Sequence, residues 1–308
     1  MAIGAVDGIS GKEAVGAGYG FQIDLTTSFT GEDSLDVSID AGNGIAEDTT
    51  TSPVTVGTPL AEFDLNGGSD ALTVDGVSYT FPVGDKMTVM VGDNTDGSAL
   101  FTTACAYGGP SNTLDDCGNV NAGITNGGVM AGASYDIGNG FTAAVGYAGS
   151  ETGIMTKALA DAWGANVAYD GGNYGVSLTY GVLESSTLHE NTYTAFNGYY
   201  SFDNGVSLSA GYEVGDIGGA AATADESEAY FFGVNGEVGP GELGAAIGTA
   251  GSMTEASGTI PEQLMYEAYY SYAVNDGMTV TPLVYIKEGA TTADNDETGM
   301  MVKTSFSF

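Results

Sequence analysis

The sequence predicts an all-β fold, a transmembrane antiparallel β-barrel of about sixteen strands. The first observation is alternation: in residues 204–213 apolar side chains alternate with small or polar ones, and residues 174–182 and 141–147 repeat the pattern. Such a period of two is typical of strands. The polar face of these predicted strands carries mostly Gly, Ser, Thr and Asn and few charged residues. This favours a barrel with lipid outside and water inside over a soluble sheet.

The second observation is the asymmetry of the connections. Tight turns recur from residue 138 onward, roughly every 35 residues, and several contain Asn-Gly or Asp-Gly, which supply the positive φ of two-residue hairpins. Longer polar connections lie between them, at 150–160, 183–191, 214–225, 251–261 and 288–296. Short turns on one side and long loops on the other are typical of bacterial outer-membrane barrels.

These patterns predict fifteen strands directly. They are 1–8, 19–29, 33–42, 72–82, 85–92, 127–137, 140–150, 161–170, 173–182, 205–214, 226–237, 240–250, 262–274, 277–288 and 297–308. Bacterial single-chain barrels have even counts, so we expect a sixteenth, short strand within the first 85 residues. Residues 58–66 fit either a strand or the second external loop, and residues 9–18 are expected to form the first. The whole chain, 1–308, is predicted to form one barrel domain, whose first strand is either complete or truncated.

The longest interval without strand character is residues 93–126, the third external loop in this interpretation. It contains both cysteines, Cys105 and Cys117, for which we expect a disulfide; a metal pair is disfavoured because no histidine is near. We expect this loop to fold inward and constrict the pore, the alternative being that it packs outward on a neighbouring subunit. The predicted constriction carboxylates are Asp93, Asp96, Asp115 and Asp116, and the predicted basic residues of the lumen are Lys86 and Lys303.

The charge balance excludes several classes of function. The 308 residues include 40 acidic and five basic ones, all Lys, for a net charge of -35, which repels nucleic acid. No run approaches the ~20 apolar residues of a spanning helix, and no signal peptide is visible. The glycine-rich fragments lack a following helix, and His189 stands alone, so we predict no enzyme, no resident cofactor and no metal site. Weak Ca²⁺ binding at acidic loops such as 93–97 and 294–297 is the one alternative.

The C-terminal sequence is the third observation. The chain ends VKTSFSF, and Phe306 and Phe308 share one face of the last strand. With segments 25–43 and 77–93, this end resembles the barrel region of cyanobacterial outer-membrane porins of the Som type, which are related to the carbohydrate-porin superfamily and include proteins described as iron-uptake porins. The family's N-terminal surface-layer-homology domain and its coiled segment are not found here.

The resemblance implies a sixteen-stranded, trimeric porin in the outer membrane of a cyanobacterium, with a terminal strand recognised by the barrel-assembly machinery. It would pass inorganic ions and small hydrophilic solutes by passive diffusion. Because acidic residues so outnumber basic ones, we expect cations to be favoured. The rival interpretation is a surface-displayed or secreted β-rich adhesin or structural protein without an open pore.

Overall fold

The computed structural model describes residues 1–7, 14–43, 62–63, 65, 70–124, 128–156, 159–184, 189–218, 226–254, 262–289 and 296–307. In this part of the chain all the regular structure is β-strand apart from a short 3₁₀ turn at residues 62–63. The strands are β1 (Ala2–Asp7), β2 (Ala14–Gly18), β3 (Gly20–Thr27), β4 (Ser34–Gly42), β5 (Thr73–Val83), β6 (Met87–Asp93), β7 (Val129–Gly138), β8 (Phe141–Gly149), β9 (Asp161–Asp170), β10 (Tyr174–Glu184), β11 (Glu190–Ser201), β12 (Val206–Ile217), β13 (Glu226–Val238), β14 (Gly241–Thr249), β15 (Met253–Thr254), β16 (Leu264–Asn275), β17 (Met278–Lys287) and β18 (Glu297–Phe306).

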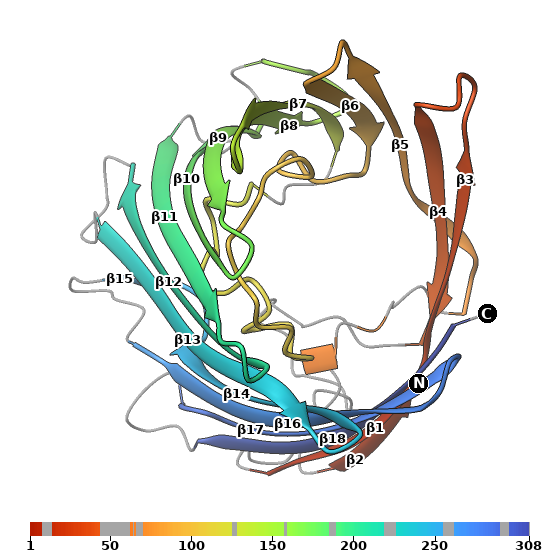
Figure 1. Ribbon diagram of the computed structural model, residues 1–308, viewed down its shortest axis with the longest axis vertical. Helices are drawn as coiled ribbons and strands as arrows, with labels where there is room; N and C mark the ends of the chain where they lie inside the picture. The colour runs from red at the N-terminus through yellow and green to blue at the C-terminus, as the bar shows by residue number, and fades with distance from the viewer. Residues whose placement is uncertain are drawn as a thin grey trace.

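The strands form one antiparallel sheet that closes on itself (Figure 1). β1 pairs with β18 as well as with β2, so the first and last strands join the ring. Only Tyr19 separates β2 from β3, and β2 pairs with β1 while β3 pairs with β4, so the two act as one spanning strand. With β15, a two-residue fragment, left aside, sixteen spanning strands remain. The prediction of about sixteen strands is confirmed.

The sixteenth strand does not lie where it was expected. It is β11, Glu190–Ser201, rather than a segment of the first 85 residues. Its outward face carries Thr192, Thr194 and Gly198 beside its aromatic residues, which weakens the alternation that marks the other strands. The interpretation of residues 9–18 as a loop was also wrong in its second half, because Ala14–Gly18 is β2.

The outer face of the barrel is apolar. Side chains that alternate along β10–β13, such as Val176, Phe196, Tyr212 and Phe232, are 41–55% exposed on a face that carries few charges. The tight turns have the expected backbone: Asn139 and Gly140 both have positive φ, 56° and 84°. None of the described helical segments is long and apolar enough to cross a membrane.

Candidate functional site: a loop anchored inside the barrel

The third long connection lies inside the ring of strands over its described residues 94–124 (Figure 1). We call it the inner loop. Cys105 and Cys117 form a disulfide with their Cα atoms 6.5 Å apart, which confirms the predicted pairing. The loop packs on the inner faces of β8–β13 and β16, so the prediction that it folds inward is confirmed as well.

Neutral side chains of the wall hold the first half of the inner loop. Asn166 on β9 accepts a hydrogen bond from Thr102 N at 3.0 Å and donates to Thr102 O at 3.1 Å. Ser177 Oγ on β10 accepts from Ala104 N at 2.9 Å, and Ser209 Oγ on β12 accepts from the amides of residues 106 and 107. The extended stretch 102–107 therefore crosses several strands, because each offers an inward polar group.

A single carboxylate holds the second half. Glu213 on β12 is 1% exposed. Its Oε2 accepts from the backbone amides of Asn121 and Ala122 and its Oε1 from Asn121 Nδ2, each at 2.8 Å. Three donors around one buried carboxylate replace the water that it loses.

Glycine on the inner wall makes room for the loop backbone. A Cβ atom on Gly146 would lie 1.8 Å from Gly97 O, and a Cβ on Gly211 would lie 1.8 Å from Cys117 O. No side chain fits at either distance. Asn197 Nδ2 donates to the same Cys117 oxygen at 2.9 Å. The strand glycines seen in the sequence thus include positions where loop and wall touch directly.

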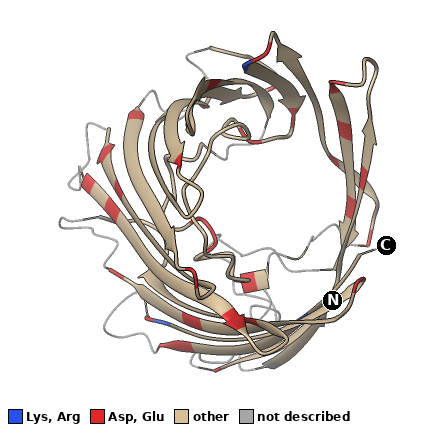
Figure 2. Cartoon of the chain, viewed as in Figure 1, with Lys and Arg blue, Asp and Glu red and all other residues tan. Residues whose placement is uncertain are grey.

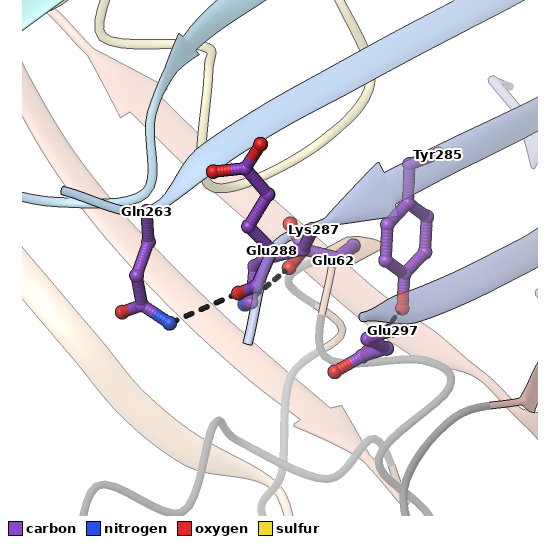
Figure 3. Close-up of polar contacts among 6 residues, drawn as sticks. All are labelled: Glu62, Gln263, Tyr285, Lys287, Glu288 and Glu297. Carbon is purple, nitrogen blue, oxygen red and sulfur yellow. Dashed lines mark hydrogen bonds and ion pairs between the residues drawn. The ribbon is translucent and has the colours of Figure 1, made fainter. Parts of the chain in front are cut away.

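A second segment also enters the barrel. Glu62, Phe63 and Leu65, which we call the inner segment, are all at least nine-tenths buried. Lys287 Nζ on β17 donates to Glu62 Oε1 at 3.0 Å (Figure 3). Lys303 Nζ lies 5.8 Å from the centroid of the Phe63 ring. This part of residues 58–66 is a 3₁₀ turn and not a strand.

The inner segment and the inner loop share an apolar core with one side of the wall. Its members come from the segment, the loop and β13–β18, and they are Phe63, Leu65, Tyr107, Leu114, Cys117, Phe231, Met265, Tyr269, Leu283, Tyr285 and Met301, together with Ala2 and Val6 of β1. The inside of the barrel is therefore not polar all round. In the second half of β17 both faces carry apolar residues, because Val284 and Ile286 are exposed on the outside while Leu283 and Tyr285 meet this core.

The predicted constriction carboxylates lie at both ends of the inner loop. Asp93 ends β6, Asp96 is exposed in the turn after it, and Asp115 is exposed next to the disulfide. Asp116 Oδ1 accepts from Gly118 N at 2.8 Å. Burial raises the pKa of Asp116 to about 7, so its side chain is only partly ionised at neutral pH.

The predicted basic residues are far apart on the fold. Lys86 lies in the turn between β5 and β6, and its Nζ is 6.0 Å from the centroid of the Tyr135 ring, which is exposed on the outer face. Lys303 points inward onto Phe63, as described above. Phe306 ends β18 with its side chain 60% exposed, and Phe308 lies outside the described residues.

The opposite wall carries carboxylates that the sequence analysis did not single out. Residues that pair across neighbouring strands lie on the same face of the sheet. Gly92 on β6 faces inward, because its Cβ would meet Thr95 of the loop. Gly92 pairs with Ser78, Ser78 with Asp36, and Asp36 with Thr26, so these residues also face inward. The same face of β3 and β4 holds Asp24 and Asp40. Figure 2 shows several acidic positions along these two strands and no basic one. A signal was present: segments 20–27 and 34–42 alternate apolar residues with Asp, Ser, Thr and Gln.

This acidic wall is open to solvent. The inward side chains of β3 (Gln22, Asp24 and Thr26) are exposed, whereas Phe231, Tyr269 and Leu283 on the other side of the barrel are buried in the core that the inner loop and inner segment share. The three carboxylates of the wall accept hydrogen bonds only from neutral groups in the described part of the chain. These are Gln22 and Ser38 to Asp24, Thr26 and Ser34 to Asp36, and Thr73 to Asp40. The described residues include no group of three His, Cys, Asp or Glu side chains able to hold a metal ion.

Comparison with known proteins gives the fold independently. No family model matches the chain, and no curated protein matches it in sequence. Among solved structures it is similar to OprB of Pseudomonas putida (TM-score 0.69, 13% identity, 100% of this chain and 93% of that one) and to an anion-selective porin from Comamonas acidovorans (0.68, 15%, 100% and 96%). It is also similar to OmpT, an outer membrane protein of Vibrio cholerae (0.66, 11%, 100% and 95%). At these identities the likeness shows a shared barrel architecture.

Proposed function

We propose that the chain is an outer-membrane porin that lets inorganic ions and small hydrophilic solutes diffuse passively and that favours cations. The observation that carries the cation preference is the acidic wall of Asp24, Asp36 and Asp40, which faces the interior. Asp24 is exposed, Asp36 and Asp40 are half-buried, and all three carboxylates accept hydrogen bonds from neutral groups. Fixed negative charges along a passage raise the local concentration of cations and lower that of anions.

The porin part of the proposal rests on architecture. The chain closes a sixteen-strand ring with an apolar outer face, and the match covers nearly the full length of solved outer-membrane barrels. One of these is named as an anion-selective porin and another as an outer membrane protein. The inner loop leaves the inner face of β3 exposed while it covers β8–β13. This arrangement suits a constricted passage between loop and acidic wall.

The test is a planar-bilayer recording of the purified protein in a KCl gradient. We expect stepwise openings and a reversal potential of the sign that cation preference gives. A variant with Asp24→Asn, Asp36→Asn and Asp40→Asn should shift the reversal potential toward zero. The matched control removes three carboxylates from tight turns (Asp85→Asn, Asp203→Asn and Asp276→Asn) and should shift it less.

Two results would contradict the proposal in different ways. Openings with anion preference would keep the porin and remove the role of the acidic wall. No openings from a correctly folded barrel would remove the porin itself.

We further propose a homotrimer, a cyanobacterial outer membrane as the location, and recognition of the last strand by the barrel-assembly machinery. Mass photometry of the detergent-extracted protein tests the first, and deletion of residues 306–308 with measurement of membrane insertion tests the last.

A further inference from the structure

Three buried oxygen atoms lie where the inner segment meets the inner loop. Glu62, Ser111 and Glu267 are 3%, 0% and 4% exposed. Each contributes an oxygen that accepts no hydrogen bond from the described residues: Glu62 Oε2, Ser111 Oγ and Glu267 Oε2. Burial of an unpartnered polar atom costs free energy, and the cost is larger for a carboxylate.

These atoms come from one neighbourhood. Asn112 N donates to Glu62 O at 2.8 Å, so Glu62 lies against the residue that follows Ser111. Tyr107 OH donates to Glu267 Oε1 at 2.5 Å, and a Cβ on Gly109 would lie 2.3 Å from that oxygen. The stretch 107–112 therefore wraps around the Glu267 carboxylate. Ser111 faces this carboxylate, and the charge of Glu62 acts on it.

The charges of the group do not balance among the described residues. It contains two carboxylates, and the Glu62 one is paired with Lys287 at 3.0 Å. Glu267 accepts a hydrogen bond from the neutral hydroxyl of Tyr107. A buried carboxylate without a compensating cation is unfavourable. Two carboxylates with one lysine leave a single formal negative charge, which one monovalent cation balances and a divalent cation would exceed.

We propose that Glu62 Oε2, Ser111 Oγ and Glu267 Oε2 bind one monovalent cation of the sodium or potassium class. The ion joins the inner segment, the inner loop and β16. Its role is to fix both inward-folded pieces against one wall, so its loss loosens them while the sixteen-strand ring persists. The site is separate from the acidic wall on β3 and β4.

The first test is thermal unfolding of the detergent-solubilised protein at constant ionic strength, with NaCl or KCl replaced stepwise by N-methylglucamine chloride. We expect a saturable rise in melting temperature of about 2–4 °C with the small cation, as binding to the folded state at tenfold over Kd produces in a chain of this size. Glu267→Gln keeps an acceptor for Tyr107 but removes the charge, and should abolish the rise. Glu228→Gln is the control, because that carboxylate pairs with Tyr212 on the outer face at 2.8 Å.

The second test locates the ion. Crystals soaked in RbCl should show an anomalous peak among the three oxygens, and Glu267→Gln crystals should lack it. If Glu267→Gln does not fold, Ser111→Ala serves, since it removes one ligand and no charge, and should weaken the dependence on the small cation. Melting that is the same in all salts, with no rubidium peak, overturns the proposal. Melting that responds to pH alone also overturns it, because a proton then takes the place of the cation.

Discussion

Removal of the Glu213 carboxylate should release the second half of the inner loop without opening the barrel. In Glu213→Ala the backbone amides of Asn121 and Ala122 lose their acceptor, and Asn121 Nδ2 keeps only Ser252 Oγ. A hydrogen bond to a charged group contributes about 1.5–3 kcal/mol, so the two amide bonds alone sum to about 3 kcal/mol at the lower bound. Since 1.4 kcal/mol is tenfold in an equilibrium, local opening should become on the order of 100-fold more frequent.

Hydrogen exchange measured by mass spectrometry reads this directly. Peptides that cover residues 119–124 should exchange on the order of 100-fold faster in Glu213→Ala, while peptides from β9 and β10 should keep the exchange rates of the unmodified protein. Glu213→Gln should be less damaging than Glu213→Ala, because its amide oxygen can still accept from both backbone amides while its amide nitrogen faces Asn121 Nδ2. Glu228→Gln, on the outer face of β13, should leave the loop unchanged.

Two results would refute this reasoning. If residues 119–124 exchange equally fast in the unmodified protein and in Glu213→Ala, the three hydrogen bonds do not hold the loop. If instead every strand exchanges faster, Glu213 supports the barrel as a whole, and the loop is not an independently anchored unit. Heat-modifiable migration in gels gives a second check, because an intact ring should still migrate as a folded barrel.

Three further predictions follow from the same loop. Burial raises the pKa of Asp116 to about 7, above its usual 3.8, so the folded loop binds the carboxyl proton of Asp116 more tightly than the unfolded loop does. The packing of the loop should therefore weaken as pH rises from about 4 to 7. Asp116→Asn should flatten that part of the profile of melting temperature against pH. Replacement of Cys105 and Cys117 by Ser should remove about 3 kcal/mol of chain-entropy stabilisation from a loop of this length, seen as protease cleavage within residues 105–117 of a barrel that still migrates as folded. Gly211→Ala should push Cys117 O away and lower the melting temperature, as overpacking of about 1–3 kcal/mol does. Gly198→Ala should not, because the nearest atom is 3.4 Å from the added Cβ. Equal effects of the two substitutions would contradict the close contact between Gly211 and Cys117 O.

The barrel was predictable because its determinants are local. Alternation along a strand and turn residues with positive φ act within about ten residues, and they recur often enough that boundaries such as 161–170 match the observed strand. β11 was missed for a local reason too. Thr192, Thr194 and Gly198 occupy its outward face, so the apolar half of the alternation is interrupted.

The contents of the barrel were predictable only in part. The spacing of Cys105 and Cys117 indicated an ordered loop, and the disulfide is present. Which wall residues hold that loop depends on pairs more than 60 positions apart, such as Asn166 with Thr102 and Glu213 with Asn121. No periodicity encodes such pairs. The burial of Phe63 is likewise a tertiary effect, since its neighbours in sequence give no sign that it enters the barrel.

The scarcity of basic residues explains how the interior is built. With five lysines and no arginine, most carboxylates have no cationic partner, and hydroxyl and amide donors take that place: Tyr107 pairs with Glu267, Tyr269 with Glu242, and Tyr285 with Glu297. Such donors satisfy the carboxylate geometry but leave its charge in place. Where the carboxylates face solvent, as on β3 and β4, mobile cations can balance that charge, as the proposed cation preference requires. At Glu267, which is buried, the proposed bound ion does so. The same composition therefore motivates both the selective wall and the interior cation site.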